Sequence, residues 1–171
     1  MSLKAPLATP VRPGAGPRHL AFGRGGAVLY VINELDGTVY VLARDGATGA
    51  LTPRQTVATL AADPHGTAAA ADIHLTPDQR FLYVSVRRDS FIAAFRVEPS
   101  DGTLSAIGRF EVETTPRSFA IDPDGRFLIC AGRDSSSIGV YTIDGATGRL
   151  ARVFAYETSA NPNWVEIIDL P

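Results

Sequence analysis

The sequence predicts an all-β protein, an incomplete β-propeller of about three four-stranded antiparallel blades with single strands at each end. The apolar segment Leu29–Ile32 recurs as Leu82–Ser85 and again as Leu128–Ala131, at offsets of 53 and then 46 residues. Short apolar runs alternate with turns rich in Gly, Asp and Pro, and no window sustains a helical period. Tandem four-stranded units at this spacing are typical of propeller blades.

Two further markers keep the same register. The turn Gly49–Leu51 recurs as Gly102–Leu104 and as Gly148–Leu150, at the same two offsets. The pair Pro17-Arg18 returns as Pro116-Arg117, 99 residues later. A β-sandwich of many short strands is the alternative fold. It gives no reason for a fixed register across three repeats, so the propeller is the prediction.

One partial propeller domain is expected over residues 1–171. Its blades are predicted at about 14–57, 70–111 and 115–157, and a final inner strand is predicted at 162–170. In the third blade the strands are expected at about 116–122, 126–132, 137–143 and 149–157. The first repeat is longer than the third, and its extra residues fall in the loop around Asp63–Gly66.

The number of blades falls short of a closed ring, because propellers close with about four to eight blades. Residues 1–11 are expected to supply the outer strand of a preceding blade. Either an N-terminal half is absent, or two copies complete one another, or the chain associates in another way; absence of the first half is the preferred interpretation. Open blade edges and apolar end faces predict self-association.

The composition of the chain limits the kinds of binding partner that are expected. The net charge is −2, and no run of five basic residues occurs, so neither nucleic acid nor an acidic membrane surface is expected as a partner. A small uncharged or anionic ligand is favoured. Cys130 is the single cysteine, which excludes an internal disulfide and fits a cytoplasmic location. The N-terminus lacks the apolar core of a signal peptide, and no stretch reaches the length of a membrane span.

Four motifs in order suggest a family. They are Gly16-Pro17-Arg18-His19, Val31-Ile32-Asn33-Glu34-Leu35, Ala71-Asp72-Ile73-His74 and Thr115-Pro116-Arg117-Ser118-Phe119. With the repeated Asp-x-Ala-Thr-Gly turn, they resemble the lactonase family of seven-bladed β-propellers, which includes 6-phosphogluconolactonases and a 3-carboxymuconate cyclase. The resemblance covers about residues 14–170 and implies hydrolysis of a sugar-acid lactone. Val86 and Arg133 depart from the residues usual in the family at those positions.

The repeat alignment itself places a candidate site. Four residues occupy equivalent places at the start of each innermost strand, and three occupy equivalent places after the second strand; these are Arg18, Ala71, Arg117 and Asn163, and Glu34, Arg87 and Arg133. The first and second strands of a blade are antiparallel neighbours, so both places meet on one face near the propeller axis.

This face collects arginines around a single carboxylate, Glu34. Guanidinium groups bind phosphate or carboxylate in bidentate fashion, which suits a small anionic lactone. We therefore assign Glu34, Arg18, Arg87 and His74 as catalytic residues, and His19, Arg117 and Arg133 as substrate-binding residues. Glu34 would act as the base that activates water. The alternatives are a plain salt bridge between Glu34 and Arg18, and arginines that pair with Asp36, Asp72, Asp89 or Asp134.

The histidines have two interpretations each. His74 lies within an innermost strand, where it could line the channel or be hydrogen-bonded within the fold. His19 aligns with Asp72, Ser118 and Trp164 and could contact a ligand or pack within the blade. His65 lies in the inserted loop, a possible lid. The three histidines show no metal-ligand spacing, so neither a metal nor another cofactor is expected. A covalent nucleophile is not expected either, since no Gly-x-Ser-x-Gly motif occurs.

The leading functional prediction is hydrolysis of 6-phosphogluconolactone to 6-phosphogluconate, an expectation that follows from the family resemblance. The arginine cluster by itself predicts only an anionic ligand. Two alternatives stay open. One is a lactone-forming cyclase that acts on a carboxylated muconate, and the other is a non-catalytic propeller fragment that serves as a binding scaffold.

Overall fold

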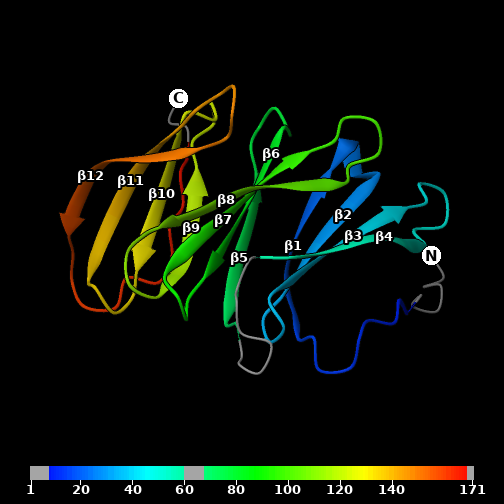
Figure 1. Cartoon of the computed structure of the whole chain (residues 1–171), viewed down its shortest axis with the longest axis horizontal. Coiled ribbons are helices and arrows are strands. Elements are labelled where there is room, and N and C mark those ends of the chain that lie inside the picture. The colour runs from blue at the N-terminus through cyan, green and yellow to red at the C-terminus, as the bar shows by residue number, and fades with distance from the viewer. Residues whose placement is uncertain (1–7, 60–67, 169–171) are drawn as a thin grey trace.

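The computed structural model describes residues 8–59 and 68–168 and contains three four-stranded antiparallel sheets (Figure 1). The first sheet consists of β1 (Pro17–Gly23), β2 (Val28–Asn33), β3 (Thr38–Arg44) and β4 (Leu51–Ala58). The second consists of β5 (Ala70–Leu75), β6 (Phe81–Val86), β7 (Phe91–Val97) and β8 (Leu104–Glu111). The third consists of β9 (Pro116–Ile121), β10 (Phe127–Gly132), β11 (Ser137–Ile143) and β12 (Leu150–Glu157).

Each sheet keeps its strands in chain order, as propeller blades do. The predicted all-β fold of three antiparallel blades is confirmed. Figure 1 shows β5 between β1 and β9, so the innermost strands of the three sheets are neighbours. A short 3-10 helix, η1 (Arg24–Gly26), joins β1 to β2. Across the described ranges, no helix has the length and hydrophobicity needed to cross a membrane.

Most of the core lies in two apolar layers, one between the first and second sheets and one between the second and third. Successive side chains of β6 point to opposite faces of the second sheet, so they contribute to both apolar layers. Leu82 and Val84 pack with the first sheet, whereas Phe81 and Tyr83 pack with the third. Every residue of β6 is therefore buried, because the second sheet is covered on both faces.

Tyrosine hydroxyls join neighbouring sheets at equivalent points. Tyr30 of β2 donates a hydrogen bond of 2.8 Å to the carbonyl oxygen of Gly102, in the turn before β8. Tyr83 of β6 donates one of 2.9 Å to the carbonyl oxygen of Gly148, in the turn before β12. The first and second blades thus each receive a turn of the next blade against their second strand.

The two end faces of the stack differ. On the first sheet, Leu29, Tyr40 and Leu42 are covered in part by Val11 and Ala15 of the preceding segment. On the third sheet, Phe154 and Tyr156 of β12 remain 61% and 56% exposed. The third sheet therefore offers aromatic surface to solvent.

The single strands expected at the ends are not observed in the described part of the chain. Residues 8–16 contain no strand, and the rest of the expected strand at 1–11 lies outside the described residues. Residues 162–168 of the expected inner strand also lack strand pairing. A strand needs a ladder of backbone hydrogen bonds. In place of such a ladder, the backbone N–H of Val165 donates a hydrogen bond of 3.3 Å to Oγ of Ser118 in β9.

Candidate active site

Each innermost strand carries a β-bulge near its start. In β1 the pairing with β2 shifts between Pro17 and Leu20, and in β5 the pairing with β6 shifts between Ala70 and Ile73. The pairing of β9 with β10 shifts where Arg117 lies. Bulges redirect side chains and are common beside active sites. The bulges contain Arg18 and His19 in β1, and Ala71 and Asp72 in β5.

Glu34 lies between two guanidinium groups from different sheets. Its Oε2 is 3.5 Å from Nε of Arg18, and its Oε1 accepts a hydrogen bond from Nη2 of Arg87. Arg87 is held in place by a second hydrogen bond, of 2.9 Å, from Nε to the carbonyl oxygen of Ala69. The structure therefore brings together three of the four residues predicted to be catalytic, and the Arg18–Glu34 salt bridge that the sequence left open as an alternative is present.

Arg18 is in a strongly positive environment. Burial lowers the pKa of Arg18, and the guanidinium groups of Arg87 and Arg117 lower it further, while Glu34 acts in the opposite direction. Arginine nevertheless stays protonated in proteins, so the cluster keeps more positive than negative charge. An anion bound here would relieve the repulsion among the guanidinium groups.

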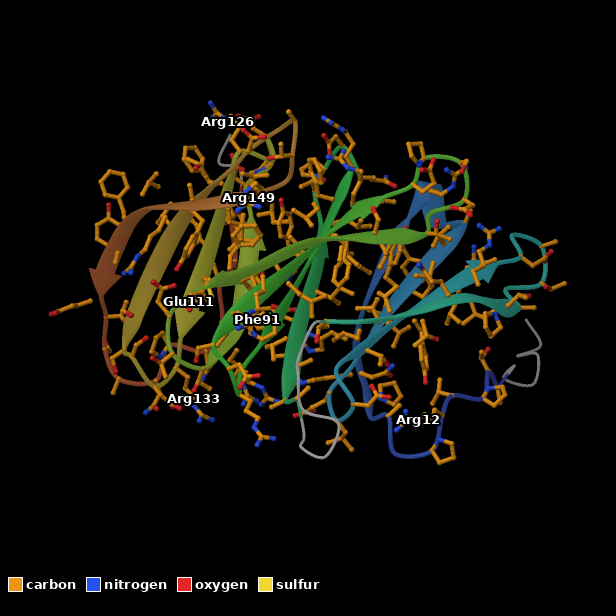
Figure 2. All side chains as sticks on the ribbon, in the orientation of Figure 1. Arg12, Phe91, Glu111, Arg126, Arg133 and Arg149 are labelled. Carbon is orange, nitrogen blue, oxygen red and sulfur yellow. The ribbon has the colours of Figure 1, made fainter. Side chains whose placement is uncertain are left out.

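Arg133 is oriented differently from the other predicted arginines. Its Nε donates a 2.7 Å hydrogen bond to Oδ1 of its neighbour Asp134. Hydrogen bonds from Arg133 and Thr115 lower the pKa of Asp134 to about 2. This is the pairing with an adjacent acid that the sequence left open as an alternative. Figure 2 shows Arg133 at one edge of the molecule, opposite Arg126 and Arg149.

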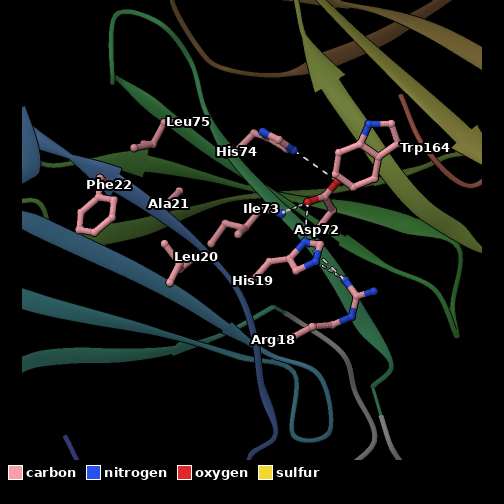
Figure 3. A pocket seen from close by; sticks show the side chains of 10 residues that line it. All are labelled: Arg18, His19, Leu20, Ala21, Phe22, Asp72, Ile73, His74, Leu75 and Trp164. Atoms are coloured by element: carbon pink, nitrogen blue, oxygen red, sulfur yellow. Dashed lines mark hydrogen bonds and ion pairs between the residues drawn. The ribbon is translucent and has the colours of Figure 1, made fainter. Parts of the chain in front are cut away.

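A buried carboxylate, Asp72, connects the two predicted histidines (Figure 3). Its Oδ1 is 2.9 Å from Nδ1 of His19, and its Oδ2 is 3.3 Å from Nε2 of His74. Burial by itself would raise the pKa of Asp72, but interactions with His74, His19 and the backbone N–H of Phe119 hold it well below its usual range. Asp72 is therefore ionised at neutral pH, and it pairs with histidines rather than with arginines.

An open hollow of about 590 Å³ runs along β1 and β5 beside this cluster. Arg18, His19, Asp72 and His74 contribute polar groups to its lining, and Leu20, Phe22, Leu75 and Trp164 contribute apolar ones. Figure 3 shows Asp72 among these polar groups, with Phe22 and Leu75 farther along the two strands. A ligand with both a charged and an apolar face would match this lining.

Sequence reasoning assigns no site role to Asp72 or Trp164, although both line the hollow. The repeat alignment places both at positions equivalent to His19, yet it offers Asp72 only as a partner for arginines. The alignment was the available signal, because equivalent positions of adjacent inner strands lie side by side. The predicted loop with His65 lies outside the described residues.

No cluster of three or more metal-ligating side chains suited to a metal ion occurs within 8–59 and 68–168. Cys130 is buried in β10, and burial raises the pKa of its thiol well above the usual value. The polar side chains of the described site are guanidinium, carboxylate and imidazole groups.

A family model described as "Lactonase, 7-bladed beta-propeller" matches residues 1–167. The chain belongs to this lactonase family. It is 48% identical over 109 residues to the 6-phosphogluconolactonase of Serratia proteamaculans, a match that covers 64% of this chain and 33% of the relative. It is 45% identical over 109 residues to that of Sodalis glossinidius, again with 64% of this chain and 33% of the relative covered.

Two solved structures agree with the fold. The periplasmic gluconolactonase of Pseudomonas aeruginosa superposes with a TM-score of 0.83 at 36% identity, covering 90% of this chain and 43% of that one. A Lactobacillus plantarum protein superposes with a TM-score of 0.87 at 32% identity, covering 93% of this chain and 47% of that one. This lactonase-family chain is thus homologous to 6-phosphogluconolactonases over part of their length. It spans about a third of the curated relatives that it matches.

Proposed function

We propose that this chain supplies the anion-binding and water-activating side chains of a sugar-acid lactone hydrolase, with 6-phosphogluconolactone as substrate and 6-phosphogluconate as product. The observation that carries the proposal is the carboxylate of Glu34 held between Arg18 and Arg87. Of these three residues, Arg18 also lines the open hollow. The homologous 6-phosphogluconolactonases support the choice of substrate.

The chemistry assigns a separate task to each kind of group. Arg18, Arg87 and Arg117 bind the phosphate, because guanidinium groups match phosphate oxygens in bidentate geometry. A carboxylate has about four lone-pair sites, so Glu34 keeps acceptors for a water molecule after it has paired with two arginines. Glu34 takes a proton as the water oxygen bonds to the lactone carbonyl carbon. The ring C–O bond then breaks, the ring oxygen takes the proton back from Glu34 and leaves as a hydroxyl, and the new carboxylic acid releases its proton to solvent.

The test is the rate of 6-phosphogluconolactone opening above its spontaneous rate, measured for the protein and for Glu34→Gln. The amide keeps the size of the side chain but cannot take the proton, so kcat/KM should fall by at least roughly a hundredfold. Arg126→Gln is the matched control, since Arg126 is exposed, pairs with Asp124 and takes no part in the Glu34 cluster.

Two outcomes would contradict the proposal. No acceleration by the unmodified protein would remove the hydrolase assignment for this chain, and an unchanged rate in Glu34→Gln would remove Glu34 from the mechanism. Parallel assays with a carboxylated muconate separate hydrolysis from lactone formation.

A further inference from the structure

Asp72 is a buried carboxylate whose surroundings consist of donors. Its side chain is 6% exposed. Oδ1 accepts hydrogen bonds from His19 Nδ1 at 2.9 Å and from the backbone N–H of Ile73 at 3.1 Å. Oδ2 accepts one from the backbone N–H of Phe119 at 3.3 Å and lies 3.3 Å from His74 Nε2. These four contacts come from three neighbouring inner strands, β1, β5 and β9.

An ionised carboxylate can only accept hydrogen bonds, so each ring nitrogen that faces it must carry a proton. This requires Nδ1–H in His19 and Nε2–H in His74. In the neutral rings the opposite nitrogens, His19 Nε2 and His74 Nδ1, then hold lone pairs. One carboxylate thus imposes opposite tautomers on two histidines.

The lone pair of His19 has a partner within the cluster. Nη1 of Arg18 lies 3.3 Å from His19 Nε2 and 3.5 Å from His19 Nδ1, and with Nδ1 protonated only Nε2 can accept from it. A guanidinium only donates, so it matches a ring nitrogen that accepts. The same Nη1 also donates to the carbonyl oxygen of Ala71. A chain of contacts therefore runs from Asp72 through His19 to Arg18, and from Arg18 to Glu34.

The lone pair of His74 remains available. In the described ranges, Nδ1 of His74 has no hydrogen-bond partner, while the ring packs edge-on against Phe119 with centroids 4.8 Å apart. The side chain is 42% exposed and lines the hollow. The ring is thus held on two sides, and one nitrogen is left to accept a hydrogen bond from a ligand.

We propose that Asp72 is the positioning residue of this site, fixing the Nδ1–H tautomer of His19 and the Nε2–H tautomer of His74, and that His74 Nδ1 accepts a hydrogen bond from a hydroxyl group of a polyhydroxylated anion. The anion itself is held by Arg18, which His19 orients. The hydroxyl-binding role rests on the proposed function, whereas the assignment of the tautomers does not.

Nitrogen-15 NMR of the imidazole rings tests the tautomers without any activity. Signals of the unmodified protein are assigned with the variants His19→Gln and His74→Gln. We expect a protonated Nδ1 in His19 and a protonated Nε2 in His74, and Asp72→Asn should abolish this opposite pattern. Asp45→Asn, in an exposed turn, should leave both histidines unchanged. Finding the same tautomer in both rings of the unmodified protein would overturn the positioning role, even if Asp72→Asn fails to fold.

Calorimetry with 6-phosphogluconate and inorganic phosphate tests the ligand contact. His74→Gln should weaken binding of 6-phosphogluconate about fivefold, the effect of one hydrogen bond, and should leave the affinity for phosphate unchanged. Equal weakening of both ligands, or no weakening of either, would overturn the hydroxyl contact. No binding of 6-phosphogluconate by the unmodified protein would count against the proposed function and the hydroxyl contact, while the NMR result would still decide the role of Asp72.

Discussion

The two carboxylates of the site, Asp72 and Glu34, are stabilised by charged or hydrogen-bonding neighbours and differ in their exposure to solvent. Asp72 is nearly inaccessible, but its donors stabilise the ionised form more than burial destabilises it. Glu34 is more exposed and is stabilised by two arginines from different sheets. Removing Asp72 would leave buried hydrogen-bond donors without an acceptor, and removing Glu34 would leave Arg18 and Arg87 without a counter-charge. Either change should cost more than the loss of a surface pair.

We expect Asp72→Asn to lower the free energy of unfolding at neutral pH by roughly 1–3 kcal/mol. The free energy of unfolding of the variant should also change less with pH in the acidic range. The pKa of Asp72 is lower in the folded protein than in the unfolded chain, so the ionised carboxylate stabilises the fold above the unfolded value of about 4. This stabilisation is lost as the pH falls from there toward the folded value. Urea denaturation at a series of acidic pH values should therefore give a steeper loss for the unmodified protein. Parallel curves would contradict the prediction.

The strands and turns show how identical local sequence can have different surroundings. Asp45–Gly49 and Asp144–Gly148 have the same five residues, and in both turns the aspartate accepts a hydrogen bond from the threonine backbone. Gly49 and Gly148 also have similar φ angles, +77° and +74°. Only the second turn packs against a preceding blade, where Gly148 accepts the hydrogen bond from Tyr83.

These two glycines provide a matched pair of substitutions. In either turn alanine would be strained by the positive φ, at a cost of about 1–2 kcal/mol. A Cβ at Gly49 would meet nothing within 4 Å, whereas one at Gly148 would lie 2.5 Å from Cδ1 of Phe81. Gly148→Ala should therefore lower the free energy of unfolding by about 1–3 kcal/mol more than Gly49→Ala does, measured by urea denaturation. Equal losses would mean that the turn before β12 does not insert against β6.

At the scale of the whole molecule, burial is distributed unevenly over the three sheets. The second sheet is covered on both faces, and its strands β6 and β7 are almost entirely buried. The third sheet is covered on one face, and seven of the eight residues of β12 are exposed. Local stability should follow this distribution, since opening a covered sheet exposes more apolar surface.

Amide hydrogen exchange should therefore be slowest in β6 and β7 and fastest in β12. The middle strands β6 and β7 of the second sheet lose protection only when both apolar layers open, whereas β12 can separate from β11 alone. Mass spectrometry of peptic fragments resolves these strands. Exchange in β12 as slow as in β6 would contradict the prediction for the single chain and would indicate that another molecule covers Phe154 and Tyr156.

The repeat register alone determined the three sheets and the meeting of Arg18, Glu34 and Arg87, because equivalent positions in tandem blades occupy equivalent places in space. The tertiary structure decided how Asp72 is used. Its partners His19 and Phe119 belong to inner strands that lie beside β5 without a hydrogen-bond ladder, and bulges redirect the side chains involved. The alternation of apolar and polar residues along a strand predicts neither the packing of β1 and β9 beside β5 nor the β-bulges. The sequence therefore allowed an arginine partner for Asp72, where the fold provides two histidines.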